Sequence, residues 1–257
     1  MSDDGKISSL AAQVMGLARD DILIHLRFFD RALSELTCRE RQKTGCFATD
    51  GSTCFYDPVY VLKCYQENPK YVTRAYLHML LHCIFFHSFQ YDRLDADKWD
   101  LAADIAVENV ILDLGLAGAA LEEDEETAGK LKILQEDAGA LTAERIYRYF
   151  VRNPLTVREE NEWKRLCVRD VHSLWKPAEQ LIVTQEQWEK ISRRVKAELK
   201  SFTKARADSG SLIKNLEEAT RDRYDYGEIL RRFMVMGEEI GVNDDEFDYV
   251  YYTYGLE

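Results

Sequence analysis

The chain has 257 residues, 46% of them hydrophobic, so it can bury a substantial core as one large domain or two smaller ones. Its 13 glycines and 4 prolines are few for a turn-rich all-β fold or for long disorder. The net charge of -12 disfavours nucleic acid and anionic membranes as partners, because both would repel the chain. No apolar run approaches the length of a membrane span and the amino terminus lacks a secretory signal, so we expect a cytoplasmic protein.

The first expected elements are helical, and a small β element follows them. Apolar residues recur at helical spacing over residues 8–36, which predicts one long helix or two consecutive ones. Between residues 45 and 58 the pattern changes. Thr49-Asp50-Gly51 is a turn signal and Cys54-Phe55-Tyr56 favours a strand, so a β-hairpin is expected there. Pro58 is suited to begin the next helix.

Residues 70–89 predict a helix that is apolar on nearly every face and therefore buried. His78 and His82 lie four residues apart on it, so both imidazoles can reach one metal ion. Buried imidazoles also need polar partners, so the alternative is a core pair that is hydrogen-bonded to backbone and to Asp104 without a metal. His87 projects away around the helix, and we expect a surface role or an outer role behind the ligands.

A stripe of acids crosses the next apolar helix, expected over residues 99–114. Asp100, Asp104 and Glu108 occur at successive four-residue steps. Zinc is usually held by three protein ligands plus water in catalytic sites, or by four in structural sites. Asp104 is the best third ligand, because a returning helix can bring it opposite the histidine pair. Glu108, one turn further on, is an outer carboxylate, a replacement ligand or a catalytic base.

The residue after the first histidine bears on activity. Zinc peptidases place a glutamate there, which takes a proton from the metal-bound water. This chain has Met79, whose thioether cannot act as a base. Loss of a positioned base typically costs ~10²–10⁴ in rate, so hydrolysis should be weak or absent unless Glu108 replaces it. The sequence has no Gly-rich phosphate loop and no Gly-x-Ser-x-Gly elbow that would indicate another enzyme class.

The second half of the chain predicts further helices. The acidic run over residues 122–126 is expected to be a solvated loop. Thr142 is a suitable N-cap for a helix that continues to Phe150, and amphipathic helices are expected over residues 185–204, 211–219 and 226–236. The tyrosine-rich end favours a strand and stops as if a following segment were missing. Six cysteines occur without a CxxC pair, so most should be buried thiols.

Four segments in this order resemble a metallopeptidase domain found upstream of von Willebrand factor A-like domains in bacterial proteins. They are Thr49-Asp50-Gly51 with Tyr56-Asp57-Pro58, Tyr76 to His82, Trp99 to Asp104, and Leu141 to Tyr147. The resemblance implies His78, His82 and Asp104 as zinc ligands, and a hairpin whose edge strand lines the cleft for a peptide substrate. It also implies work alongside a MoxR-type ATPase, which makes an assembly role an alternative to proteolysis.

Together these observations predict a mainly helical α+β fold of zincin-like design, with a small β-hairpin before the histidine helix and a helical carboxy-terminal extension. We expect a metallopeptidase-like domain over residues 1–152, the extension over 153–243, and a linker or strand over 244–257 leading to a missing A-like domain. The predicted function is binding of zinc or another divalent metal at His78, His82 and Asp104, with weak or no peptidase activity. The alternatives are an interaction module for a MoxR-type ATPase and an active hydrolase that uses Glu108 as its base.

Overall fold

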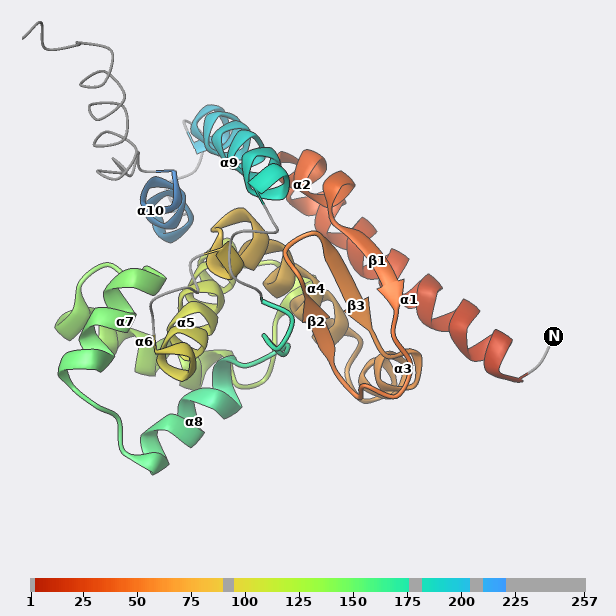
Figure 1. Cartoon of the computed structure of the whole chain (residues 1–257), viewed down its shortest axis with the longest axis horizontal. Helices are drawn as coiled ribbons and strands as arrows, with labels where there is room; N and C mark the ends of the chain where they lie inside the picture. The colour runs from red at the N-terminus through yellow and green to blue at the C-terminus, as the bar shows by residue number, and fades with distance from the viewer. Residues whose placement is uncertain (1–2, 90–94, 176–181, 204–209, 221–257) are drawn as a thin grey trace, which may run out of the picture. The chain divides into compact units, whose positions relative to one another are not determined.

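The computed structural model describes residues 3–89, 95–175, 182–203 and 210–220, and shows a mainly helical α+β protein with one small sheet (Figure 1). The expected fold class is therefore confirmed. The helix predicted over residues 226–236 and the strand predicted over 244–257 lie outside the described residues. Among the helices that are described, none combines the length and apolarity needed to cross a membrane.

The amino-terminal segment forms two helices rather than one. Helix α1 spans Asp3–His25, a 3-10 turn (η1) spans Arg27–Phe29, and α2 spans Asp30–Glu35. The buried side chains of α1 recur every three or four residues: Ala11, Val14, Met15, Ala18 and Ile22. This stripe packs against α3 (Pro58–Glu67) and α4 (Pro69–Ile84), so α1 covers the histidine helix.

The sheet has the strand order β1-β3-β2. Strands β2 (Phe47–Thr49) and β3 (Thr53–Tyr56) form the expected antiparallel hairpin, while β1 (Thr37–Glu40) pairs with β3 in parallel. Every residue of β1 is exposed, so it carries no apolar alternation from which a strand could be predicted. Gly51 at the hairpin turn has φ +89, and a Cβ there would lie 2.8 Å from the Ser88 Oγ atom, so the turn requires glycine.

Helix α4 is the central element, as its composition predicts. Every residue from Val72 to Ile84 is buried. The helix ends at Ile84, before the predicted end at Phe89, because Phe86 adopts φ 61 and the chain then forms a 3-10 turn (η2) over His87–Phe89. This early end turns His87 back towards the helix that precedes it.

Helix α5 (Ala96–Leu114) connects two hydrophobic cores, and the helices that build these cores lie on either side of it in Figure 1. Val107, Val110 and Ile111 join the core built by α1 to α4. The residues from Trp99 to Ala106, except Asp100 and Asp104, join a second core with α6 (Asp124–Ala138), α7 (Ala143–Arg152) and α8 (Val157–Cys167). The acidic stripe of α5 therefore runs along the boundary between the two cores.

The prediction of a solvated loop over residues 122–126 is wrong for its second half. Asp124 begins helix α6, where negative side chains interact favourably with the helix dipole. Asp124 also forms an ion pair with buried Arg74 at 3.2 Å, and Glu123 forms one with Arg169 at 3.2 Å. Like charges so close together are tolerated because basic partners come from distant parts of the chain.

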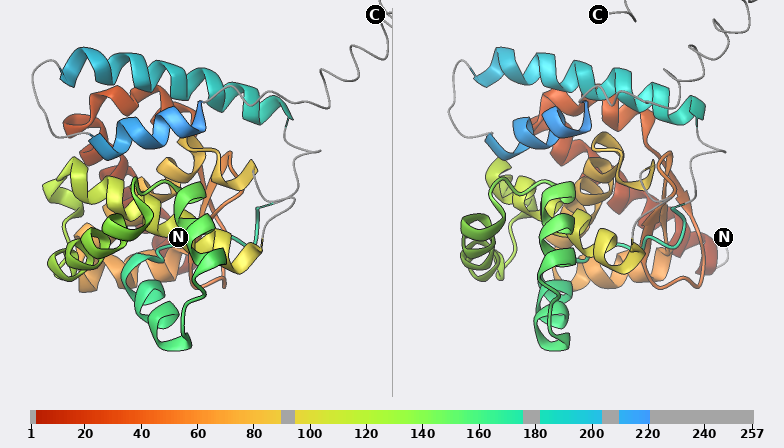
Figure 2. Two further views of the ribbon diagram at one scale, coloured as in Figure 1. Left: turned by 90° about the vertical axis from the view of Figure 1, so that its left-hand side faces the viewer. Right: turned by 60° about the vertical axis from the view of Figure 1, so that its left-hand side comes forward.

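The carboxy-terminal helices α9 (Ile182–Thr203) and α10 (Gly210–Ala219) pack side by side against the rest of the described chain (Figure 2). Buried Trp188 of α9 donates its indole N–H to the Gly51 carbonyl at 2.6 Å, and Ser192 donates to the Ile84 carbonyl at 2.6 Å. Helix α9 thereby ties the hairpin turn to the end of α4. The domain boundaries at residues 152 and 243 stay predictions.

The six cysteines are free thiols, and four of them are buried. Cys54, Cys64, Cys83 and Cys167 are the buried ones, as expected for most of the set. Cys38 is exposed and Cys46 is partly buried.

Candidate metal centre

Helices α4 and α5 bring the three predicted ligands together. The Nε2 atom of His78 lies 2.9 Å from Oδ1 of Asp104, and the Nε2 atom of His82 lies 3.2 Å from the same oxygen. All three residues are buried. The four-residue spacing on α4 and the antiparallel return through α5 are enough to produce this arrangement.

A fourth residue, Asp170, completes the cluster and was missed by the sequence reasoning. Its Oδ1 atom lies 3.6 Å from Nε2 of His78 and 3.9 Å from Nε2 of His82. The four candidate ligand atoms all lie within 4.8 Å of one another. Ligand atoms in a tetrahedral zinc site with bonds of about 2.0–2.2 Å are roughly 3.3–3.6 Å apart, so the cluster has the size of a metal site.

Asp170 distinguishes a metal site from an ordinary buried pair of histidines. Neither of its carboxylate oxygens accepts a hydrogen bond in the described structure, although its side chain has no exposed surface. A buried carboxylate without donors is costly unless a cation satisfies it. Hydrogen bonds among His78, His82 and Asp104 would suffice for a metal-free core, but they leave Asp170 unsatisfied. The residues present therefore fit a divalent ion.

The outward-facing nitrogens of the two histidines have partners of their own. Nδ1 of His78 lies 2.8 Å from Oε1 of Glu108, and Nδ1 of His82 lies 2.9 Å from Nδ1 of His87. Such outer contacts orient metal-binding imidazoles. His87 is thus buried behind His82 rather than at the surface.

Glu108 is engaged on both oxygens. Its Oε1 atom contacts His78, and its Oε2 atom accepts hydrogen bonds from Nε and Nη2 of Arg74 at 3.0 and 2.7 Å. Burial alone would raise the pKa of Glu108, but Arg74 and His78 lower it to about 2. A carboxylate with so low a pKa is a poor proton acceptor near neutral pH. Its role as a base stays a prediction.

The two candidate ligand histidines, His78 and His82, differ in charge. Burial alone would lower the pKa of His78, but hydrogen bonds to Asp104 and Glu108 raise it to about 9. Burial lowers the pKa of His82 to about 4, because its contact with Asp104 offsets only part of the desolvation. In the metal-free protein at neutral pH, His78 is therefore protonated and His82 is neutral.

The segment that carries Asp170 is fixed against the sheet. Helix α8 ends at Cys167, and the chain continues in an extended conformation. Val171 donates its backbone N–H to the Phe47 carbonyl at 2.9 Å and forms a parallel bridge with Ala48 of β2. The chain's own segment thus pairs with the edge of β2, the strand expected to line a substrate cleft.

Met79 faces the sheet and not the ligands. It is fully buried, and its Sδ atom lies 3.7 Å from the Cys54 Sγ atom in β3. The side chain fills the core between α4 and the sheet, as expected for a methionine with no catalytic role.

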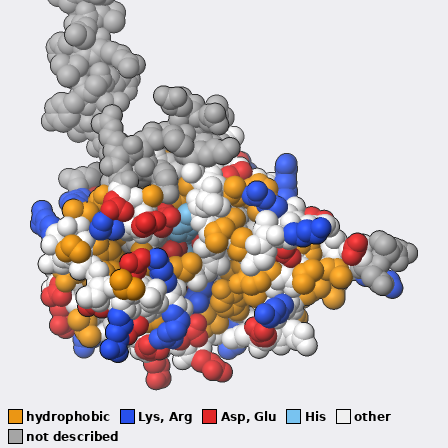
Figure 3. Space-filling view, turned by 60° about the horizontal axis from the view of Figure 1, so that its bottom comes forward, with side chains coloured by type: hydrophobic (Ala, Val, Ile, Leu, Met, Phe, Trp, Pro, Cys, Tyr) orange, Lys and Arg blue, Asp and Glu red, His pale blue; other side chains and the backbone are white. Residues whose placement is uncertain are grey.

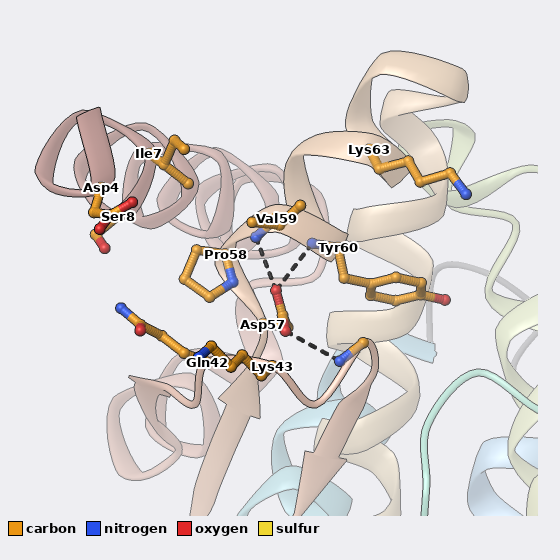
Figure 4. Close-up of a pocket in the computed structure, with 11 residues that line it drawn as sticks. Asp4, Ile7, Ser8, Gln42, Lys43, Asp57, Pro58, Val59, Tyr60 and Lys63 are labelled. Atoms are coloured by element: carbon orange, nitrogen blue, oxygen red, sulfur yellow. Dashed lines mark hydrogen bonds between the residues drawn. The ribbon is translucent and has the colours of Figure 1, made fainter.

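A hollow of about 630 Å³ lies apart from the cluster, between the start of α1, the β1–β2 connection and the start of α3 (Figure 4). Hydrophobic side chains extend across the right-hand half of the face seen in Figure 3, with basic side chains between them. Of the two carboxylates that line this hollow, Asp4 and Asp57, the second accepts three backbone N–H groups, from Val59 at 2.9 Å, Tyr60 at 3.2 Å and Gly45 at 3.1 Å. Asp57 is therefore a helix cap rather than a candidate ligand.

Comparison with known proteins assigns the chain to a family. No curated protein and no solved structure matches it. The family model described as "Putative metallopeptidase domain" matches residues 17–240, which include every residue of the cluster. The chain therefore belongs to this metallopeptidase-domain family.

Proposed function

We propose that this chain is a metallopeptidase-derived domain that binds one zinc ion through His78, His82, Asp104 and Asp170 and has little or no hydrolytic activity. The observation that carries the proposal is the buried Asp170 carboxylate, which accepts no hydrogen bond from the described residues and lies beside both histidines. Two imidazoles and two carboxylates form a donor set that zinc accepts.

Three features support a site without efficient hydrolysis. Zinc catalysis requires an open position for water, which the ion activates, and a base to take the proton. Asp170 would supply a fourth protein ligand and so complete a four-coordinate site without a bound water. Met79 stands in place of the base, and the backbone of Val171 pairs with the β2 edge that a peptide would use. Each feature removes one requirement of a peptidase.

Glu108 in this proposal orients His78 and is not the base. Its Oε1 atom contacts the His78 nitrogen that faces away from Asp104, and Arg74 fixes its Oε2 atom. We expect Glu108→Gln to lower zinc affinity by about 10–100-fold, the usual effect of losing an outer partner. Chelator-sensitive hydrolysis that is present in the wild type and lost in Glu108→Gln with its zinc retained would instead support the role of base.

The proposal is tested by metal analysis of protein purified without chelator. We expect one zinc per chain, retained on dialysis, and little or none in His82→Ala or Asp170→Ala. His25→Ala is the matched control, because His25 lies on α1 with its side chain 55% exposed and away from the cluster. Stoichiometric zinc in both His82→Ala and Asp170→Ala would refute these ligands.

The absence of hydrolysis is tested separately with a peptide library. We expect no chelator-sensitive cleavage by the wild type. Met79→Glu should not restore cleavage, because the side chain at position 79 faces the sheet, and Asp170→Ala should not restore it either, because that variant loses its zinc. Efficient cleavage by the wild type would contradict the proposed inactivity while leaving zinc binding intact.

Interaction with a MoxR-type ATPase or a von Willebrand factor A-like domain stays a prediction. Capture of such a partner by both the wild type and zinc-free His82→Ala would separate an assembly role from the metal site.

A further inference from the structure

His172 lies beside the four proposed ligands and shares their surroundings. Its side chain is 4% exposed, and its Nε2 atom lies 3.3 Å from Oδ1 of Asp104 and 3.3 Å from Oδ1 of Asp170. These are hydrogen-bond lengths, yet Nε2 makes no hydrogen bond of acceptable geometry within the described structure. A buried ring nitrogen that points between two ligand carboxylates without bonding either has the position of another ligand.

His172 is arranged around Asp104 in the same way as His78 and His82. Each directs Nε2 towards Asp104 and Nδ1 towards a different outer residue. For His172 the outer residue is Asp100, whose Oδ1 atom lies 3.3 Å from Nδ1. A metal-binding histidine almost always has such an outer partner, often a carboxylate. His172 therefore has both contacts expected of a ligand, one on each ring nitrogen.

The acidic stripe of α5 accounts for this arrangement. Asp104 occupies its centre and contacts all three histidines, while Asp100 and Glu108 lie one turn away on either side. Asp100 contacts His172, and Glu108 contacts His78. One helix face thus supplies a central ligand and two outer carboxylates, because residues four apart share a face.

The ring of His172 is also held in place. It stacks on Trp175 with ring centroids 3.6 Å apart and planes 12° apart. Asp170 and His172 are separated by Val171, which pairs with β2, and in an extended segment alternate residues point to the same face. The pairing that positions Asp170 therefore positions His172 as well.

We propose that His172 is a fifth protein ligand of the metal ion. The inference rests on the proposed zinc site and extends it to three imidazoles and two carboxylates. Five donors exceed the four of a structural zinc site and give the ion a five-coordinate environment, which zinc accepts. The ion would then be enclosed by side chains from α4, α5 and the segment after α8.

The test uses ¹¹³Cd²⁺ as the probe and protein labelled with ¹⁵N-histidine. A splitting between ¹¹³Cd and a ring nitrogen passes only through a coordinate bond, so a nearby charge does not produce it. The chain has five histidines, and substitution of each in turn assigns its resonances. We expect the Nε2 resonances of His78, His82 and His172 to split, those of His25 and His87 to stay single, and zinc to remove the splitting by displacing cadmium.

The outcomes separate the two proposals. Splitting of His78 and His82 without His172 would overturn the fifth ligand and leave the four-ligand site standing. A protein that binds no cadmium and no zinc would overturn both.

A second measurement uses a variant that keeps the aromatic stack. His172→Phe retains a ring against Trp175, and we expect its zinc affinity to fall by more than tenfold, while His25→Phe should match the wild type. An unchanged zinc affinity in folded His172→Phe would also contradict the fifth ligand.

Discussion

Two buried aspartates, Asp57 and Asp170, have opposite surroundings. Asp57 accepts hydrogen bonds from three backbone N–H groups and begins helix α3. Asp170 accepts none within the described structure and lies among histidine nitrogens. The first carboxylate is satisfied by backbone donors, whereas the second has only longer contacts with histidine nitrogens, which suit a bound cation. Burial of a carboxylate therefore indicates a functional site only where the fold does not supply its donors.

Glu108 is a third buried carboxylate, and it forms an ion pair with Arg74. Loss of this ion pair should change the free energy of unfolding more than any other substitution considered below. Arg74→Met would leave the Glu108 charge buried with its strongest partner removed, so we expect a loss of about 3–5 kcal/mol in the free energy of unfolding. Urea denaturation of the metal-free proteins measures it. Arg165→Met is the control, because the Arg165–Glu126 pair is half-exposed and contributes about 0–1 kcal/mol. Equal losses in the two variants would show that burial of the pair is unimportant.

Removal of the ion should lower the stability of the Asp57 and Asp170 variants by different amounts. With free zinc a thousand-fold above its Kd, binding stabilises the folded chain by about 4 kcal/mol, and chelator should abolish this gain. We expect the gap between zinc-loaded and chelated protein to shrink in Asp170→Asn and to stay full in Asp57→Asn. Thermal denaturation with and without chelator measures the gap. A full gap in Asp170→Asn would mean that its carboxylate does not bind the ion.

In the metal-free state, substitution of Asp57 should lower the free energy of unfolding more than substitution of Asp170. Asp57→Ala removes the N-cap of α3 and should cost about 1–2 kcal/mol. Asp170→Asn removes a buried charge whose contacts with histidine nitrogens are 3.3 Å or longer and include no hydrogen bond in the described structure, so we expect a smaller loss than that of Asp57→Ala. Urea titration in chelator compares them. Marked destabilisation by Asp170→Asn would reveal that the fold does satisfy this carboxylate.

Zinc binding should release protons, which is the smallest of the expected effects. The pKa of His78 is raised to about 9 in the metal-free protein, so at pH 7 the ion must displace a proton from it. The apparent zinc affinity should therefore rise with pH until His78 is neutral near pH 9. His82, with its pKa lowered to about 4, contributes no release at pH 7. Calorimetry in buffers of different ionisation enthalpy counts the protons, and zero release would contradict a protonated His78.

Local sequence patterns predict the part of the candidate site that lies on α4 and α5. The spacing of His78 and His82 and the four-residue steps of the α5 acids are periodic signals within single helices, so they identify which side chains share a face. The hairpin followed from Thr49-Asp50-Gly51, whose turn chemistry is equally local. The structure places these parts as expected.

The part of the candidate site that follows α8 depends on tertiary pairing, which such patterns do not encode. Asp170 and His172 occur in a short extended segment that one backbone hydrogen bond to β2 aligns with the cluster. Their alternation around Val171 was the available signal, because both side chains of such a pair face the same way. Strand β1 and the start of α6 were missed for similar reasons, since the first is fully exposed and the second begins in a run of acids.

The hydrogen bonds made by helix α9 set a lower limit on the part of the chain that can be studied alone. Trp188 inserts its indole against the Gly51 carbonyl, and Ser192 binds the carbonyl at the last residue of α4. A shortened protein that stops after Trp175 would keep every proposed ligand, yet it would expose the apolar face that Trp188 covers. Recombinant fragments should therefore include helix α9, even when only the ion is of interest.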